Sequence, residues 1–281
     1  MLVVVVAAAV FVAIDVGGGA PARSAIAHAH APAGSAVIHA TSRPRPAVLQ
    51  RAALERLIGL GYPIYCGARR GNAVALTFDD GPGVYTHYAL PKLAAAHEHV
   101  TFFVVGKSID AWPGWVQREV RLAAIGDHTY THPFLPGLSG AGIREEIERT
   151  KLKIEALTGR PVYLFRPPYG AVSPAVDQVV RSLGLLRIMW TFDSGDSLGA
   201  NWLGIIHNVE VGLRPGAIIL MHENRGQTIR ALTTLLPYLH RHHLRSVTVP
   251  ELLASDPPSL AQLKAGPYGC GAAHVSLRGA Y

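Results

Sequence analysis

The feature that most constrains the fold is an alternation of apolar, strand-like runs with helix-like stretches, which begins at Asn72. The strand-like runs are Val74–Phe78, Thr101–Val105, Val162–Phe165, Arg187–Phe192, Ala217–Met221 and Ser246–Val249, with a weaker one near Ile125. The helix-like stretches are Tyr88–His97, Trp115–Ala124, Ile143–Leu157, Ala175–Leu183, Leu203–Val211 and Ile229–His240. Repeated β-then-α units join parallel strands by helical crossovers. About seven units predict an α/β fold, either an incomplete or distorted barrel or a doubly wound sheet.

The two ends of the chain lack this pattern. Leu2–Ile14 is a continuous apolar run, which is short for a membrane span and is followed by small residues. It is typical of a secretory signal despite the missing basic residues before it, and an uncleaved anchor is the alternative. After Leu253 the chain is rich in Pro and Gly. We therefore divide the chain into a signal peptide or anchor at 1–27, a linker and lead-in at 28–71, the alternating domain at 72–255 and a tail at 256–281.

Charge and cysteine usage bear on compartment and partners. The net charge of +7 suits anionic surroundings such as a cell wall, and a secreted or wall-associated protein is expected. The basic residues are scattered and do not interleave with aromatic residues, so no nucleic-acid partner is expected. Contact with a membrane is expected only through an uncleaved N-terminal segment. Cys66 and Cys270 form an even pair, which predicts a disulfide in an exported protein, with two unpaired thiols as the alternative.

Two adjacent carboxylates end the first strand-like run, in the sequence Ala75-Leu-Thr-Phe-Asp-Asp-Gly-Pro82. The end of a strand points Asp79 and Asp80 in different directions, so the two side chains can have different roles. Ionised neighbours repel, and a fold tolerates them most readily beside a cation or an arginine. Taken alone, Asp-Asp-Gly is more often a solvated turn.

Residues able to perform chemistry also follow the later strand-like runs. They are His128, His132, Arg166, Asp193, Asp196 and His222. In a (β/α) barrel the carboxyl ends of the strands form one face, where catalytic groups gather. The sequence therefore predicts a single site at that face.

His128-Thr-Tyr-Thr-His132 places two imidazoles within reach of one metal ion if the segment makes a single helical turn. Alone, such a pair is more often structural or incidental. Asp80 would complete a set of two histidines and one carboxylate with an open position, as in hydrolytic zinc sites. Arg166 precedes a stiff Pro-Pro turn and could hold a carboxylate through two hydrogen bonds.

Taken in order, TFDDGP, HTYTH, RPPYG, DSGD and LMH resemble the five motifs of the polysaccharide deacetylases with a NodB homology domain, carbohydrate esterase family 4. The resemblance covers about Ala73–Leu253. It implies a distorted (β/α)7 barrel and a divalent metal, usually Zn²⁺ but also another ion such as Co²⁺. The implied metal ligands are Asp80, His128 and His132.

The resemblance also implies roles for the other motif residues. Asp79 would be the general base, held by Arg166, and His222 the general acid, hydrogen-bonded to Asp196. The backbone N–H of Tyr169 would stabilise the oxyanion, and Leu220 would line the pocket for the acetyl methyl group.

The implied activity is metal-dependent removal of N-acetyl groups from an amino-sugar polymer, peptidoglycan or chitin-like. The alternatives are an acetyl-xylan-type O-deacetylase on the same fold and a catalytically weak glycan-binding homologue. Ser197 stands where the family typically has tryptophan, which widens or wets the acetyl pocket. Asp127 stands where the family often has asparagine, and an extra carboxylate there is expected to favour a protonated His128.

Overall fold

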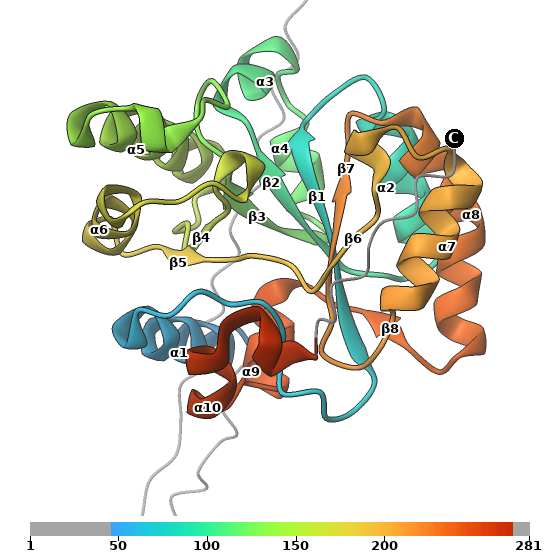
Figure 1. The fold of residues 1–281 in the computed structure, drawn as a ribbon. Helices are drawn as coiled ribbons and strands as arrows, with labels where there is room; N and C mark the ends of the chain where they lie inside the picture. The colour runs from blue at the N-terminus through green and yellow to red at the C-terminus, as the bar shows by residue number, and fades with distance from the viewer. Residues whose placement is uncertain (1–45, 272–281) are drawn as a thin grey trace, which may run out of the picture. The chain divides into compact units, whose positions relative to one another are not determined.

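The computed structural model describes residues 46–271, so the expected signal or anchor at 1–27 and parts of the expected linker and tail lie outside the described residues. In the described part, eight parallel strands form one sheet in the order β5-β4-β3-β2-β1-β7-β6, with β8 paired to β1 (Figure 1). The strands are β1 Ala73–Gly81, β2 Val100–Val104, β3 Ala123–Asp127, β4 Leu164–Phe165, β5 Leu186–Arg187, β6 Phe192–Asp193, β7 Ile218–His222 and β8 Arg245–Ser246. Among residues 46–271 no helix is long and apolar enough to cross a bilayer.

Helices connect all successive strands except β5 and β6, and further helices precede β1 and follow β8. They are α1 Pro46–Leu60, α2 Thr86–Ala95, α3 Gly106–Ala111, α4 Val116–Glu119, α5 Gly140–Thr158, α6 Pro174–Ser182, α7 Trp202–Gly212, α8 Gly226–Arg241, α9 Val249–Ser255 and α10 Leu260–Ala265. The start of α6 follows from a local signal: the Ser173 side chain accepts from the backbone N–H of Val176, and Pro174 is the first helical residue. The expected distorted (β/α)7 barrel is confirmed, and it stays open between the edge strands β5 and β6.

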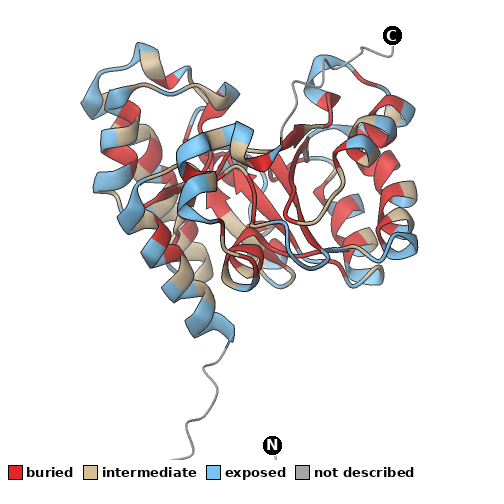
Figure 2. Ribbon diagram, turned by 60° about the horizontal axis from the view of Figure 1, so that its bottom comes forward, coloured by how far each residue is buried: buried red, intermediate tan, exposed pale blue. Residues whose placement is uncertain are grey.

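Apolar side chains alternate between the two faces of the central strand β1. Val74, Leu76 and Phe78 pack with the surrounding helices, whereas Ala75 packs on the inner side. The inner cluster also contains Leu57 of α1, so a helix from the expected linker and lead-in is part of the core. Figure 2 shows the strands buried, and the exposed residues on the outer faces of the helices.

The predicted single strand over Arg187–Phe192 is wrong, because β5 and β6 at its two ends lie at opposite edges of the sheet. Between them the chain crosses the open side of the barrel. There Ile188 bridges to Ile64, and Thr191 N donates to the carbonyl of Ile218 at 2.8 Å. Burial of this crossing segment explains its apolar composition without continuous strand pairing.

The predicted helix over Trp115–Ala124 is mostly wrong. Only Val116–Glu119 is helical, and Ala123 already pairs with Val100 of β2. Pairing with a neighbouring strand outweighs a weak helical propensity here.

The C-terminal region is more regular than predicted. The expected strand Ser246–Val249 stops at Ser246, and Thr248 caps α9 with Glu251 in a reciprocal capping box. The tail is not patternless, because Ser259 caps α10 in the same way. Both Ser/Thr-x-x-Glu/Gln signals are present in the sequence.

The predicted disulfide between Cys66 and Cys270 is confirmed. The two Cα atoms are 5.8 Å apart and 204 residues separate them in sequence. The bond fixes the tail beside the chain segment that precedes β1. A cross-link over so long a loop removes conformational freedom mainly from the unfolded chain.

Candidate active site

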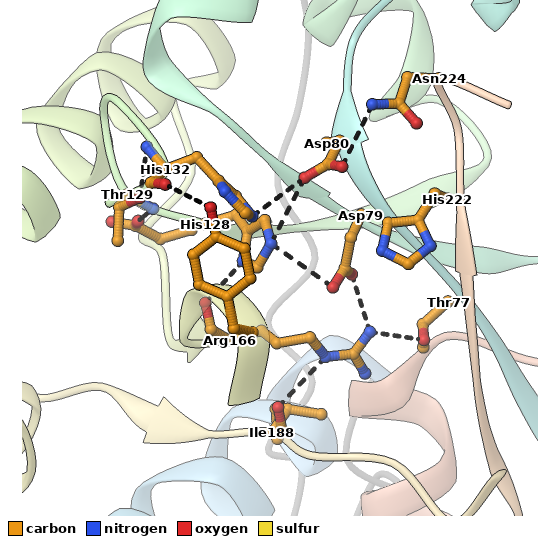
Figure 3. A network of polar contacts seen from close by, with 12 residues as sticks. Thr77, Asp79, Asp80, His128, Thr129, His132, Arg166, Ile188, His222 and Asn224 are labelled. Atoms are coloured by element: carbon orange, nitrogen blue, oxygen red, sulfur yellow. Dashed lines mark hydrogen bonds and ion pairs between the residues drawn. The ribbon is translucent and has the colours of Figure 1, made fainter. Parts of the chain in front are cut away.

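Asp79 and Asp80 lie at the carboxyl end of β1 and point in different directions, as Figure 3 shows. Asp79 is buried and lies opposite His222 of β7 in the strand register. Asp80 has a positive φ of 71°, an uncommon conformation for a residue other than glycine. This backbone turn separates the two carboxylates, and backbone strain of this kind is common at functional sites.

Arg166, which follows β4, is fully buried and spans the inside of the barrel. Its Nη1 donates to Asp79 Oδ1 and to Thr77 Oγ1, both at 2.8 Å. Its Nε and Nη2 donate to the backbone carbonyls of Ile188 and Met189 at 3.2 and 3.1 Å. The guanidinium therefore fixes the Asp79 carboxylate to the segment that crosses the open side of the barrel (Figure 3).

Burial raises the pKa of Asp79, and the charge of Arg166 opposes this rise. The carboxylate is thus a stronger base than an exposed aspartate while remaining paired with a cation. Burial lowers the pKa of Arg166, and Asp79 offsets part of this effect.

Asp80, His128 and His132 converge on one point beside Asp79. Asp80 Oδ1 lies 3.6 Å from His128 Nε2 and 3.3 Å from His132 Nε2. This oxygen is buried and has no hydrogen-bond donor among the described residues. Two ligand atoms on a tetrahedral zinc ion, each about 2.0–2.1 Å from the metal, lie about 3.3 Å apart. The three side chains therefore fit a divalent cation with N and O ligands.

The outer contacts of these side chains orient them for such a role. His128 Nδ1 lies 2.7 Å from the carbonyl of Arg166, so it carries the proton and leaves Nε2 free to bind. Asn224 Nδ2 donates to Asp80 Oδ2 at 3.1 Å. Burial lowers the pKa of His128 to about 3, so the imidazole is neutral.

The expectation that Asp127 favours a protonated His128 is therefore wrong. The Asp127 carboxyl is buried, its pKa is raised well above the ordinary value by desolvation, and it accepts from the backbone N–H of Thr129. Burial of His128 lowers its pKa, and Asp127 does not offset this effect.

The helical turn predicted for residues 128–132 is absent. Thr129 and His132 have positive φ angles of 68° and 60°, and His132 N donates to Thr129 Oγ1 at 3.1 Å. The histidines converge through this irregular bend and not through helical spacing. Their ring centroids are 4.9 Å apart.

His222 and Asp196 form a second pair on the other side of Asp79. His222 Nδ1 lies 2.7 Å from Asp196 Oδ1, and Thr228 Oγ1 donates to Asp196 Oδ2 at 2.6 Å. Burial alone would lower the pKa of His222, but the hydrogen bond and charge of Asp196, with Asp79 and Asp80 adding to them, raise it to about 9. At neutral pH this imidazole carries a proton that it can donate.

These groups open into one cleft of about 540 Å³. Tyr169 and Leu220 line it, as does Ser197 at the position where tryptophan is typical. Trp190 also lines the cleft, whereas Trp202 packs under Arg230, 4.3 Å from its guanidinium carbon. An indole from the crossing segment therefore lines the same cleft as Ser197.

Sequence reasoning missed three residues that hold the site: Thr77, Asn224 and Thr228. Each of the three forms a hydrogen bond with a site residue that was predicted from the sequence. Thr77 and Asn224 also lie within two positions of a predicted site residue in the sequence, and this proximity was the available signal. Thr228 lies on α8 and carries no such signal.

A buried pair of carboxyl groups supports the loops behind the cleft. Glu223 N donates to the carbonyl of Asp79 at 2.9 Å, and its side chain accepts from Thr86. The side chain also packs against Gly81, where a Cβ atom would lie 1.7 Å from Glu223 Oε2. Glu119 of α4 faces Glu223, and both are fully buried. Desolvation raises the pKa of Glu223 to about 7, and it also raises the pKa of Glu119 well above its ordinary value.

This pair makes folding stability depend on pH. An acid whose pKa is raised in the folded state binds a proton that the unfolded chain releases, so the free energy of unfolding falls as pH rises from about 4.5 to about 7. The change for Glu223 is roughly 3 kcal/mol. We expect the double variant Glu119→Gln, Glu223→Gln to lose at least that much less stability between pH 5 and 8 in urea unfolding, because it removes both acids. An unchanged pH slope, relative to the exposed control Glu145→Gln, would show that folding does not raise the pKa values of these two groups.

Comparisons with known proteins agree with this architecture. The profile of the family described as "Polysaccharide deacetylase" matches residues 67–188. The chain is 35% identical over 187 residues to peptidoglycan-N-acetylglucosamine deacetylase PgdA of Listeria monocytogenes, which covers 66% of this chain and 40% of that protein. It is 31% identical over 186 residues to a chitooligosaccharide deacetylase of Azorhizobium caulinodans, and this match covers 60% of this chain and 88% of that protein. A solved CE4 family pseudoenzyme of Bacillus anthracis matches with a TM-score of 0.65 and 30% identity, over 70% of each chain.

The chain belongs to the polysaccharide deacetylase family, carbohydrate esterase family 4. It spans 40% of the length of the Listeria protein and most of the length of the Azorhizobium protein. Because a pseudoenzyme has the same fold, membership of this family alone does not decide whether the cleft is catalytic. The side chains in the cleft must decide that question.

Proposed function

We propose that this protein is a metal-dependent hydrolase that removes N-acetyl groups from an amino-sugar polymer, peptidoglycan or chitin-like. The observation that carries the proposal is the placement of a carboxylate base, a set of three metal-binding groups and a protonated imidazole around one cleft. A metal-dependent amide hydrolase uses each of these, because its water must be activated and its amine leaving group must be protonated.

Asp80, His128 and His132 would hold a divalent cation, with Zn²⁺ favoured by the two imidazole ligands and Co²⁺ as another candidate. A bound cation would polarise the acetyl carbonyl and lower the pKa of the attacking water. The buried Asp79 Oδ2 lies 3.6 Å from His128 Nε2, beside the ligand set, so it can take the proton of that water. Arg166 keeps this carboxylate in place.

His222 lies across the cleft from the histidine ligands and gives its proton to the leaving nitrogen. Asp196 fixes the imidazole through Nδ1 and leaves Nε2 as the donating atom. The Tyr169 backbone N–H supports the carbonyl oxygen as it gains charge, and Leu220 contacts the acetyl methyl group; both residues line the cleft.

A secreted or wall-associated location is part of the proposal. The apolar run at the start of the sequence and the positive net charge support it. The Cys66–Cys270 disulfide supports it further, because such bonds persist mainly in oxidising compartments.

A second candidate function is a catalytically weak, glycan-binding homologue. The exposed Ser197 favours it, because the cleft lacks the aromatic wall that is typical at this position. The similarity to a pseudoenzyme is consistent with it. Tight glycan binding without acetate release would support this candidate.

The reaction is tested by offering the zinc-loaded protein N-acetylglucosamine oligomers, peptidoglycan and acetylated xylan. We expect acetate and new free amines in equal amounts from at least one of the first two substrates. Release of acetate from xylan, with no free amine formed from the other two substrates, would instead identify an O-deacetylase.

A further inference from the structure

Glu146 of α5 accepts three hydrogen bonds from the segment between the two histidines. Its Oε2 accepts from the backbone N–H groups of Tyr130 at 3.0 Å and Thr131 at 2.7 Å. Its Oε1 accepts from the Thr131 hydroxyl at 2.8 Å. One carboxylate therefore binds both residues at the middle of the His128–His132 bend.

The bend depends on side chains because it is not helical. Positive φ angles at Thr129 and His132 are strained, most of all for a β-branched residue such as Thr129. Besides Glu146, Asp127 accepts from the Thr129 amide at 2.7 Å, which fixes only the start of the bend. Figure 3 shows Thr129 beside the two imidazoles that this backbone presents to Asp80.

The helix that carries Glu146 is a rigid support. The N-cap Ser139 and the left-handed Gly159 define its ends, and it packs against β3 (Figure 1). Arg149, one turn after Glu146, lies over the Tyr130 ring with its guanidinium carbon 3.5 Å from the centroid. The helix therefore contacts the bend through two neighbouring residues on one face.

We propose that Glu146 is a positioning residue that sets the metal affinity of the Asp80, His128 and His132 site by fixing the bend between the histidines. The inference rests on the proposed function only in taking a divalent metal as the ligand of that site. Without this carboxylate, two backbone donors and one hydroxyl lose their partner, and the position of His132 relative to Asp80 is less firmly held. Outer contacts of this kind typically change metal affinity 10- to 100-fold.

The test is the Zn²⁺ dissociation constant at neutral pH, measured by competition with a chromogenic chelator. Glu146→Ala is expected to weaken zinc binding by about 10- to 100-fold. Glu146→Gln should lie between this variant and the wild type, because its amide oxygen accepts from the backbone but its NH₂ group cannot accept from Thr131. Glu145→Ala is the matched control, since Glu145 is exposed on the same helix, and should bind zinc like the wild type.

Melting of the metal-free proteins separates positioning from general stability. The proposal is overturned if folded Glu146→Ala binds zinc within twofold of the wild type, or if Glu145→Ala weakens binding equally. If Glu146→Ala does not fold, Glu146→Gln and Thr131→Val decide, and wild-type affinity in both would contradict the proposal. Acetate release is not measured, so a failure of the proposed deacetylase function would leave this result interpretable.

Discussion

Asp79→Asn is expected to abolish acetate release while zinc still binds. The amide has nearly the shape of the carboxylate but cannot accept the proton of the attacking water. Loss of a general base typically costs 10²- to 10⁴-fold in rate. Asp80, His128 and His132 are untouched, so the metal site should remain. The measurement is kcat for acetate release together with bound zinc per chain.

The same substitution tests the buried ion pair. Arg166 is fully buried and Asp79 is its carboxylate partner, so the variant leaves a buried cation without its counter-charge. Breaking such a pair by removing one partner costs about 3–5 kcal/mol. Activity must therefore be compared at a temperature where both proteins are folded. A folded, zinc-loaded Asp79→Asn protein with wild-type kcat would exclude Asp79 as the base.

His222→Ala is expected to separate amide from ester substrates. The imidazole, with its pKa raised to about 9 through Asp196, is a proton donor at neutral pH. An amine leaving group needs that proton, whereas an alkoxide departs more readily without it. We expect a loss of about 10²- to 10⁴-fold on N-acetyl substrates and a much smaller loss on O-acetyl substrates.

The pH profile of the wild-type protein tests the same general-acid role of His222. Because the active form of His222 is protonated, activity on N-acetyl substrates should decline as pH rises through about 9. Asp196→Asn is the companion variant, since removing the charge that raises the pKa of His222 should move this decline to lower pH. Equal losses on amide and ester substrates in His222→Ala would argue against a general-acid role.

Local pattern predicted the alternating α/β fold and the polar residues that end its strands, and the family resemblance added the (β/α)7 barrel. β1 and β7 are long apolar runs ended by polar residues, so their position and the different directions of Asp79 and Asp80 followed from the sequence alone. The capping signals at Ser173, Thr248 and Ser259 are equally local, although the last two were overlooked.

What the sequence could not predict depends on contacts between distant segments. Residues 188–191 resemble a strand but cross the open side of the barrel, where Ile64 meets Ile188 across more than 100 intervening residues. The bend at 128–132 has the spacing of a helical turn, yet Glu146 and Asp127 hold it in another conformation. The effect expected of Asp127 on His128 was wrong because the complete burial of both side chains is a tertiary property.

One measurement tests the central claim most directly: acetate release and bound metal, determined on the same sample of protein before and after chelation and again after zinc is restored. We expect one zinc per chain, release of acetate from N-acetylglucosamine oligomers or peptidoglycan only in the loaded states, and neither zinc nor activity in Asp80→Asn. Acetate release that persists in fully chelated protein, or a folded chain that binds no divalent metal, would contradict it.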